Sequence, residues 1–143
     1  MICFPKTQSR RKGVSAVWIE TNNNPMSRRV GDCSVRAVAT ALGISWEEAY
    51  TLLAAAGYRM GNVISSNEVI TAVLRQHGFY KKAIPNTCPD CYTIADFCED
   101  HPYGTFVLFT SGHVATVIDG DLYDVWDSSD EIPLFYCYRR EDD

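Results

Sequence analysis

Residues 31–43 read GDCSVRAVATALG and have the pattern of a buried helix that begins at a cysteine. The apolar side chains recur at the spacing of one helical face, namely at Val35, Val38, Ala39 and Leu42. Gly43 stands at the position of a helix-ending glycine, and Asp32 is a good N-cap residue. The pattern therefore predicts that Cys33 is the first residue inside this helix.

The predicted position of Cys33 favours its thiolate form. Unpaired backbone N–H groups and the positive end of the helix dipole stabilise an anion there, so that the thiol pKa is expected to fall. A nucleophilic thiol also needs a base within hydrogen-bond reach, and the base needs a third group that fixes its tautomer.

His113 is the best candidate for the base among the three histidines. His77 and His101 each fall at the end of a predicted helix, where a histidine has an ordinary structural place. His113 instead begins a predicted strand directly after Ser111-Gly112, where a missing side chain allows close approach of another chain or a ligand.

A hairpin after His113 supplies the third group. If Asp119-Gly120 forms a two-residue turn, Asp124 lies diagonally from His113 on the same face of the sheet. If the turn takes three residues, His113 faces Asp127 instead, because a slip of one residue exchanges the faces. We prefer Asp124, since Trp126 would then share its face and shield the His–Asp hydrogen bond from water.

The order of elements along the chain predicts an α+β fold. Capping signals and apolar stripes predict helices over residues 33–43, 45–57, 65–78 and 93–102. Strands are predicted at residues 14–19, 105–110, 113–118, 122–126 and 132–138. Helices followed by a meander of strands favour N-terminal helices packed on one face of a C-terminal antiparallel sheet.

Composition limits the class of protein. A chain of 143 residues, 46% hydrophobic and 22% charged, fits one globular domain over residues 1–143, with residues 1–30 as an irregular segment. No apolar run approaches the ~20 residues that span a bilayer. The first residues lack the order of a secretory signal, which predicts a cytoplasmic protein. The net charge of −5 disfavours nucleic acid as the partner, despite small basic clusters at residues 10–12 and 28–29.

Six cysteines raise the question of a metal site. Without a secretory signal, free thiols or a metal are expected before disulfides. Four residues have a spacing seen in structural zinc sites, and they are Cys88, Cys91, Cys98 and His101. Burial of Cys98 on the inner face of its helix is the competing interpretation, and we predict no cofactor.

The order of Cys33, His113 and Asp124 resembles that of papain-like cysteine peptidases, and the segment 124–126 looks like the Asn/Asp-x-Trp of that superfamily. Residues 31–50 and 104–138 are also similar to short papain-fold proteins of phages and bacteria. The resemblance implies Cys33 as nucleophile, His113 as general base and acid, and Asp124 as the orienting residue. It implies a hydrolase that cleaves a peptide or isopeptide bond of a protein or peptide substrate.

The chain departs from the papain-like pattern at the oxyanion site. Those enzymes usually carry a glutamine about six residues before the cysteine, and Ser27 takes that position here. The backbone N–H of Cys33, helped by Asn24 or Ser27, is the predicted replacement. The chain is also short for two lobes, so a shallow cleft partly built by residues 1–30 is expected. The departure motivates an alternative, a papain-like binding or inhibitory module without turnover; a zinc-stabilised nucleic-acid adaptor is the third hypothesis.

Overall fold

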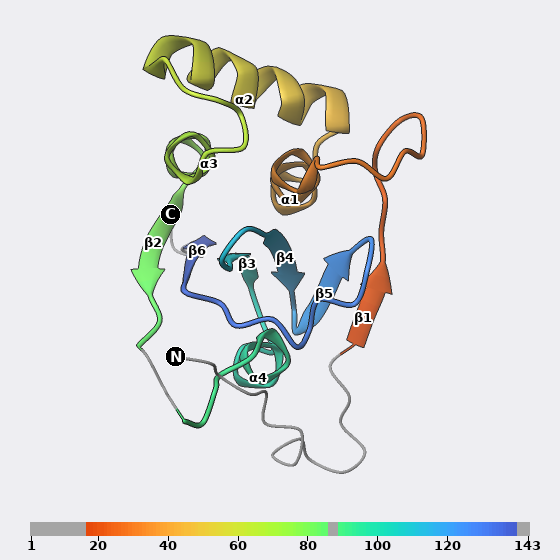
Figure 1. Ribbon diagram of the computed structural model, residues 1–143, viewed down its shortest axis with the longest axis vertical. Coiled ribbons are helices and arrows are strands. Elements are labelled where there is room, and N and C mark those ends of the chain that lie inside the picture. Colours follow the sequence, from red (N-terminus) through yellow and green to blue (C-terminus); the bar gives the residue numbers. More distant parts are fainter. Residues whose placement is uncertain (1–16, 86–88, 140–143) are drawn as a thin grey trace.

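One mixed sheet of six strands organises the protein in the computed structural model, which describes residues 17–85 and 89–139. The strands lie in the order β1-β5-β4-β3-β6-β2 (Figure 1). Their bounds are β1 (Val17–Glu20), β2 (Phe79–Ala83), β3 (Thr105–Phe109), β4 (Val114–Ile118), β5 (Asp121–Asp124) and β6 (Phe135–Arg139). The predicted α+β class is confirmed, and the papain-like architecture stays a prediction.

The sheet differs from the predicted antiparallel meander at both edges. β1 pairs with β5 in parallel, whereas every other neighbouring pair is antiparallel. β2 was not predicted, and it pairs with the last strand, β6. β1 itself confirms the described part of the strand predicted at residues 14–19, within residues 1–30, which were otherwise expected to be irregular.

All four predicted helices are present, as α1 (Cys33–Leu42), α2 (Trp46–Met60), α3 (Asn67–Gln76) and α4 (Ile94–Asp100). Ser45 caps α2, and Thr93 with Asp96 forms a complete capping box on α4. The predicted end of α2 at Gly57 is wrong. The helix continues to Met60 and ends at the left-handed Gly61.

The helices cover both faces of the sheet, so the prediction that they pack on one face is wrong. Figure 1 shows α1, α2 and α3 on one side of the strands and α4 on the other. Alternation along the strands explains the division, because successive side chains point to opposite faces. In β3, Val107 packs in the cluster with α1 to α3, whereas Leu108 packs with α4.

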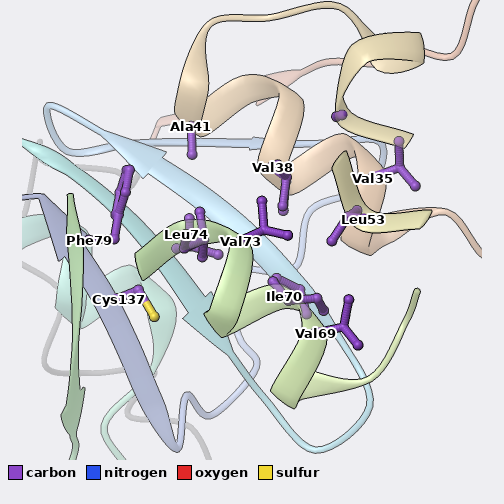
Figure 2. Packing of buried hydrophobic residues seen from close by; sticks show 14 of the residues in the cluster. Val35, Val38, Ala41, Leu53, Val69, Ile70, Val73, Leu74, Phe79 and Cys137 are labelled. Carbon is purple, nitrogen blue, oxygen red and sulfur yellow. The ribbon is translucent and has the colours of Figure 1, made fainter. Parts of the chain in front are cut away.

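The larger core cluster holds α1 in place over the sheet. Its apolar residues come from α1, α2, α3 and the strands beneath them, as Figure 2 shows. Val35 and Val38 of the predicted stripe are no more than 1% exposed, and they pack near Leu53, Ile70 and Val73. Deleting one such side chain costs roughly 2–5 kcal/mol of stability, so that this packing fixes the orientation of the helix that begins at Cys33.

The turn between β4 and β5 has the register predicted for a two-residue hairpin. Asp119 and Gly120 both have positive φ, 50° and 81°, and Ile118 pairs with Asp121. Positive φ at both central residues is typical of a type I′ turn, whose twist matches that of the two strands it connects. The confirmed register determines which carboxylate faces His113.

Candidate active site

Cys33 is the first residue of α1, as predicted, and the helix that carries it is tied to the sheet. The Thr116 hydroxyl on β4 donates to the carbonyl of Ala37 at 2.8 Å, a fully buried hydrogen bond between strand and helix. The half-buried Cys33 thiol accepts a hydrogen bond from the backbone N–H of Val114 and forms another with the His113 side chain. The structure therefore brings together the sulfur and the imidazole that the sequence singled out.

His113 lies in the turn just before β4, and its backbone carbonyl accepts a hydrogen bond from the N–H of Thr110 at 2.9 Å. A Cβ at Gly112 would meet nothing within 4 Å, so no other described part of this chain approaches closely there, and close approach by a ligand stays a prediction. The φ of 103° at Gly112 is what requires glycine. The glycine thus allows the tight turn that presents His113 to Cys33.

Asp124, the last residue of β5, forms a hydrogen bond with the ring nitrogen Nε2 of His113. His113 Nε2 lies 2.6 Å from Asp124 Oδ2, which leaves Nδ1 as the ring nitrogen available to the thiol. The carboxylate is 2% exposed as a residue and accepts three further hydrogen bonds. They come from the Ser128 hydroxyl at 2.7 Å, the Val125 N–H at 2.8 Å and Arg36 Nη1 at 3.0 Å.

The alternative partner, Asp127, lies elsewhere. Its side chain is exposed and accepts a hydrogen bond from the Ser129 N–H at 3.1 Å. Trp126 lies against His113, with ring centroids 5.1 Å apart, although 43% of the tryptophan is exposed. The register places Asp124 beside His113, whereas Asp127 accepts a hydrogen bond within its own turn.

The three groups shift one another's pKa values in the directions that an ion pair requires. Burial alone raises the pKa of the Cys33 thiol, but the hydrogen bonds from His113 and Val114 and the charges of His113 and Arg36 outweigh it and lower that pKa. Burial alone lowers the pKa of His113, but hydrogen bonds to Asp124 and Cys33 raise it to about 9. Near neutral pH this arrangement favours a thiolate beside an imidazolium.

Two charged residues, Arg36 and Asp32, lie next to the pair formed by Cys33 and His113. Arg36 was not identified from the sequence. Arg36 is 8% exposed, and its Nε lies 2.8 Å from Oδ1 of Asp32. The other oxygen of Asp32 accepts hydrogen bonds from Trp46 Nε1 at 3.0 Å and Asn24 Nδ2 at 3.2 Å. Asp32 stands at the N-cap position, but its side chain does not cap the helix. The i, i+4 spacing of Asp32 and Arg36 was the available signal.

The predicted side-chain donors for an oxyanion have other roles. The Asn24 amide nitrogen donates to Asp32, while its oxygen accepts hydrogen bonds from the N–H groups of Met26 and Arg28. Ser27 is exposed and lies in the turn that Asn24 organises, with a φ of 55°. The backbone N–H of Cys33 remains as a donor, because the first N–H groups of a helix have no partner within it.

The three described residues of the predicted zinc site do not form a ligand set. Cys91 is disulfide-bonded, which contradicts the expected free thiol. The Cys98 thiol is buried in the apolar cluster under α4, and the His101 ring stacks on Phe97 with centroids 3.7 Å apart. Cys88 lies outside the described residues. Within residues 17–85 and 89–139, no group of three or more metal-binding side chains is present.

Comparisons with known proteins leave the geometry as the basis for function. No family model, no curated protein and no solved structure matches the chain. In the described part of the chain, none of the helices combines the length and the apolar character that crossing a membrane requires.

The site places a nucleophile, the Cys33 thiol, beside a group that can carry a proton, the His113 imidazole. A thiolate at a helix N-terminus can attack an electrophilic carbon, and an adjacent imidazolium can protonate the group that leaves. The buried Asp124 carboxylate keeps the imidazole in one orientation.

Proposed function

We propose that the protein is a thiol hydrolase that acts by acyl transfer on a peptide or isopeptide bond, in the manner of papain-like cysteine peptidases. The observation that carries the proposal is the chain of contacts from the Cys33 thiol to His113 and on to the buried Asp124. Together with the lowered pKa of the thiol, this chain is what a cysteine nucleophile needs and what a structural cysteine lacks.

The proposed reaction has two halves. The Cys33 thiolate attacks the carbonyl carbon, a C–S bond forms, and the C–N bond breaks as His113 gives its proton to the departing amine. His113 then takes a proton from water, which attacks the thioester and releases the acid while the thiol is restored. The backbone N–H of Cys33 is the proposed donor to the oxyanion in both halves.

Alkylation with iodoacetamide at pH 7 tests the nucleophile first. We expect Cys33 to be labelled well before Cys98 and Cys137, whose burial raises their pKa values to about 12 and about 11. These two thiols are controls within the same molecule, and peptide mass mapping reports all three. Equal labelling of the three residues in folded protein would contradict the proposal.

Turnover is tested with libraries of peptides and isopeptide-linked peptides. The wild type is expected to cleave a subset and to accumulate a hydroxylamine-sensitive acyl adduct on Cys33, whereas Cys33→Ala gives neither product nor adduct. The commitment of Asn24 to Asp32 supports a second candidate, a binding or inhibitory module. A reactive Cys33 with no cleavage in either library, together with a stable complex with a protein partner, would favour that candidate.

The sequence predicts a cytoplasmic location, and the proposed reaction does not depend on it. The disulfide at Cys91 counts against a strongly reducing compartment, because such bonds are rare where glutathione keeps thiols reduced. A protein or peptide is the proposed substrate in either location.

A further inference from the structure

A pocket of about 460 Å³ opens beside the N-terminal end of α1. Residues directly before and after Cys33 line one of its sides, namely Gly31, Asp32, Ser34 and Val35. Cys33 itself is not among the lining residues, so the pocket adjoins the nucleophile through its neighbours in the chain.

The other walls of the pocket are largely apolar. They come from the segment 24–30, from α2 and from the connection between α2 and α3, and include Met26, Val30, Trp46, Tyr50 and Ile64. Met26 is 78% exposed, and Val30 and Tyr50 are each 43% exposed, so that apolar surface faces water around the opening. Contiguous exposed apolar surface of this kind is typical of a binding site.

An aromatic pair gives the pocket a firm wall. The rings of Trp46 and Tyr50 stack with centroids 5.2 Å apart, and Trp46 Nε1 is anchored on Asp32, the residue before Cys33. A preformed aromatic wall offers a large contact area to an apolar group at little entropic cost.

The charges at the pocket disfavour a basic occupant. The Asp32 carboxylate already accepts hydrogen bonds from Arg36, Trp46 and Asn24. Arg28 lines the pocket, and within the described part of the chain it makes no ion pair. A lysine or arginine side chain would meet this cation, and among the described lining residues Asp32 is the only carboxylate, already paired.

We infer that this pocket binds a large apolar or aromatic side chain of the substrate, next to the bond that Cys33 attacks, and that it discriminates against basic side chains. The inference rests on the proposed function, since it makes the pocket a specificity site for that thiol. It names the substrate class as peptides with a bulky apolar residue beside the cleaved bond.

N-substituted iodoacetamides test the inference without a known substrate, because they react with Cys33 and place one chosen group nearby. N-phenethyl-, N-methyl- and N-(4-aminobutyl)iodoacetamide are compared by the rate at which each alkylates Cys33, divided by its rate with glutathione. We expect the phenethyl probe to exceed the methyl probe by about tenfold, the range that a pocket gives for added apolar groups. The aminobutyl probe is expected to show no advantage over the methyl probe.

Variants locate the preference. Tyr50→Ala and Val30→Glu are each expected to reduce the phenethyl-to-methyl ratio at least threefold, on the order of what a partial loss of apolar contact gives. Tyr58→Ala is the matched control, because Tyr58 lies on the same helix, is 90% exposed and does not line the pocket. A ratio near one in the wild type, or equal ratios in Tyr50→Ala and Tyr58→Ala, would overturn the inference.

The outcome is separable from that of the proposed function. If Cys33 reacts with iodoacetamide no faster than Cys98 and Cys137, the proposed function fails whatever the ratio. If Cys33 reacts selectively but the ratio is near one, the thiol hydrolase survives and the specificity pocket does not.

Discussion

Arg36 Nη1 lies 3.0 Å from Oδ1 of Asp124, and the same guanidinium places Nε 2.8 Å from Oδ1 of Asp32. One buried cation thus joins the residue before Cys33 to the residue that binds His113. Both carboxylates are less than 10% exposed and need a counter-charge at close range. The bridge therefore holds the first turn of α1 at a defined distance from the end of β5, and with it the sulfur from the imidazole.

Replacing Arg36 by glutamine should weaken both the fold and the thiolate. We expect Arg36→Gln to lower the free energy of unfolding by about 3–5 kcal/mol, because it leaves two buried carboxylates without a cation. The pKa of the Cys33 thiol should rise, since one of the charges that lower it is removed. Urea unfolding and the pH dependence of Cys33 alkylation measure the two effects.

Arg29→Gln is the control for Arg36→Gln. Arg29 is exposed, and its ion pair with Glu20 spans 3.7 Å. Its loss should change stability by no more than about 0.5 kcal/mol and leave the alkylation profile in place. Arg36→Lys should recover part of the thiolate effect, because it restores the charge. If Arg36→Gln behaved like Arg29→Gln, the bridge would have no part in the site.

Asp124→Asn should uncouple the histidine from the thiol. Removing the carboxylate takes away the hydrogen bond and the charge that raise the pKa of His113 to about 9, so that this pKa should fall. Less of the His113 ring is then protonated at pH 7, so its positive charge stabilises the thiolate less. The pKa of the Cys33 thiol should therefore rise, and alkylation of Cys33 at pH 7 should slow by about tenfold for each unit by which that pKa exceeds the pH.

Asp127→Asn makes the same chemical change on an exposed side chain three residues along. It is expected to leave both the His113 titration, followed by NMR, and the alkylation rate as in the wild type. Similar effects from the two substitutions would mean that the hydrogen bond between His113 and Asp124 has no special role.

The stability contributed by His113 should depend on pH. Its pKa in the folded protein is raised from the ordinary histidine value of 6.5 to about 9, so folding favours the protonated ring. This contribution is fully present below pH 6.5 and is lost as the pH rises through about 9. The difference in unfolding free energy between wild type and His113→Gln should therefore shrink between pH 6 and pH 10 by on the order of 3 kcal/mol. A difference that stays constant over this range would refute the raised pKa.

Features written in short stretches of sequence were predicted well. The start of α1 at Cys33, the start of the fourth helix at residue 93 and the register at Asp119-Gly120 each depend on a few neighbouring residues, and all three are confirmed. The register is what placed Asp124 rather than Asp127 beside His113. The position of the candidate site could be predicted because its residues lie at the ends of helices and strands whose limits are set by a few neighbouring residues.

Features that depend on distant partners were missed. β2 reads FYKKA, in which two adjacent lysines break the alternation of a strand, and it forms because β6 offers an edge to pair with. The parallel pairing of β1 with β5 leaves no local signal either. The buried Arg36 pairs with two carboxylates, and one of them, Asp124, lies 88 positions away in the chain. Long-range pairing has no short sequence signature.

Gly57 shows how a local rule can mislead and yields a sharp prediction. A glycine at the end of an apolar stripe was interpreted as a helix end, but the helix continues to Met60, and the backbone of Asn62 packs against Gly57. A Cβ at residue 57 would lie 2.7 Å from the carbonyl oxygen of Asn62. Gly57→Ala should therefore destabilise the protein by about 1–3 kcal/mol, although alanine is the better helix former by ~1 kcal/mol. Ala55→Gly, on the exposed side of the same helix, should cost about 1 kcal/mol by propensity alone. Urea unfolding compares the two, and a stabilised Gly57→Ala would show that the close approach of Asn62 does not constrain α2.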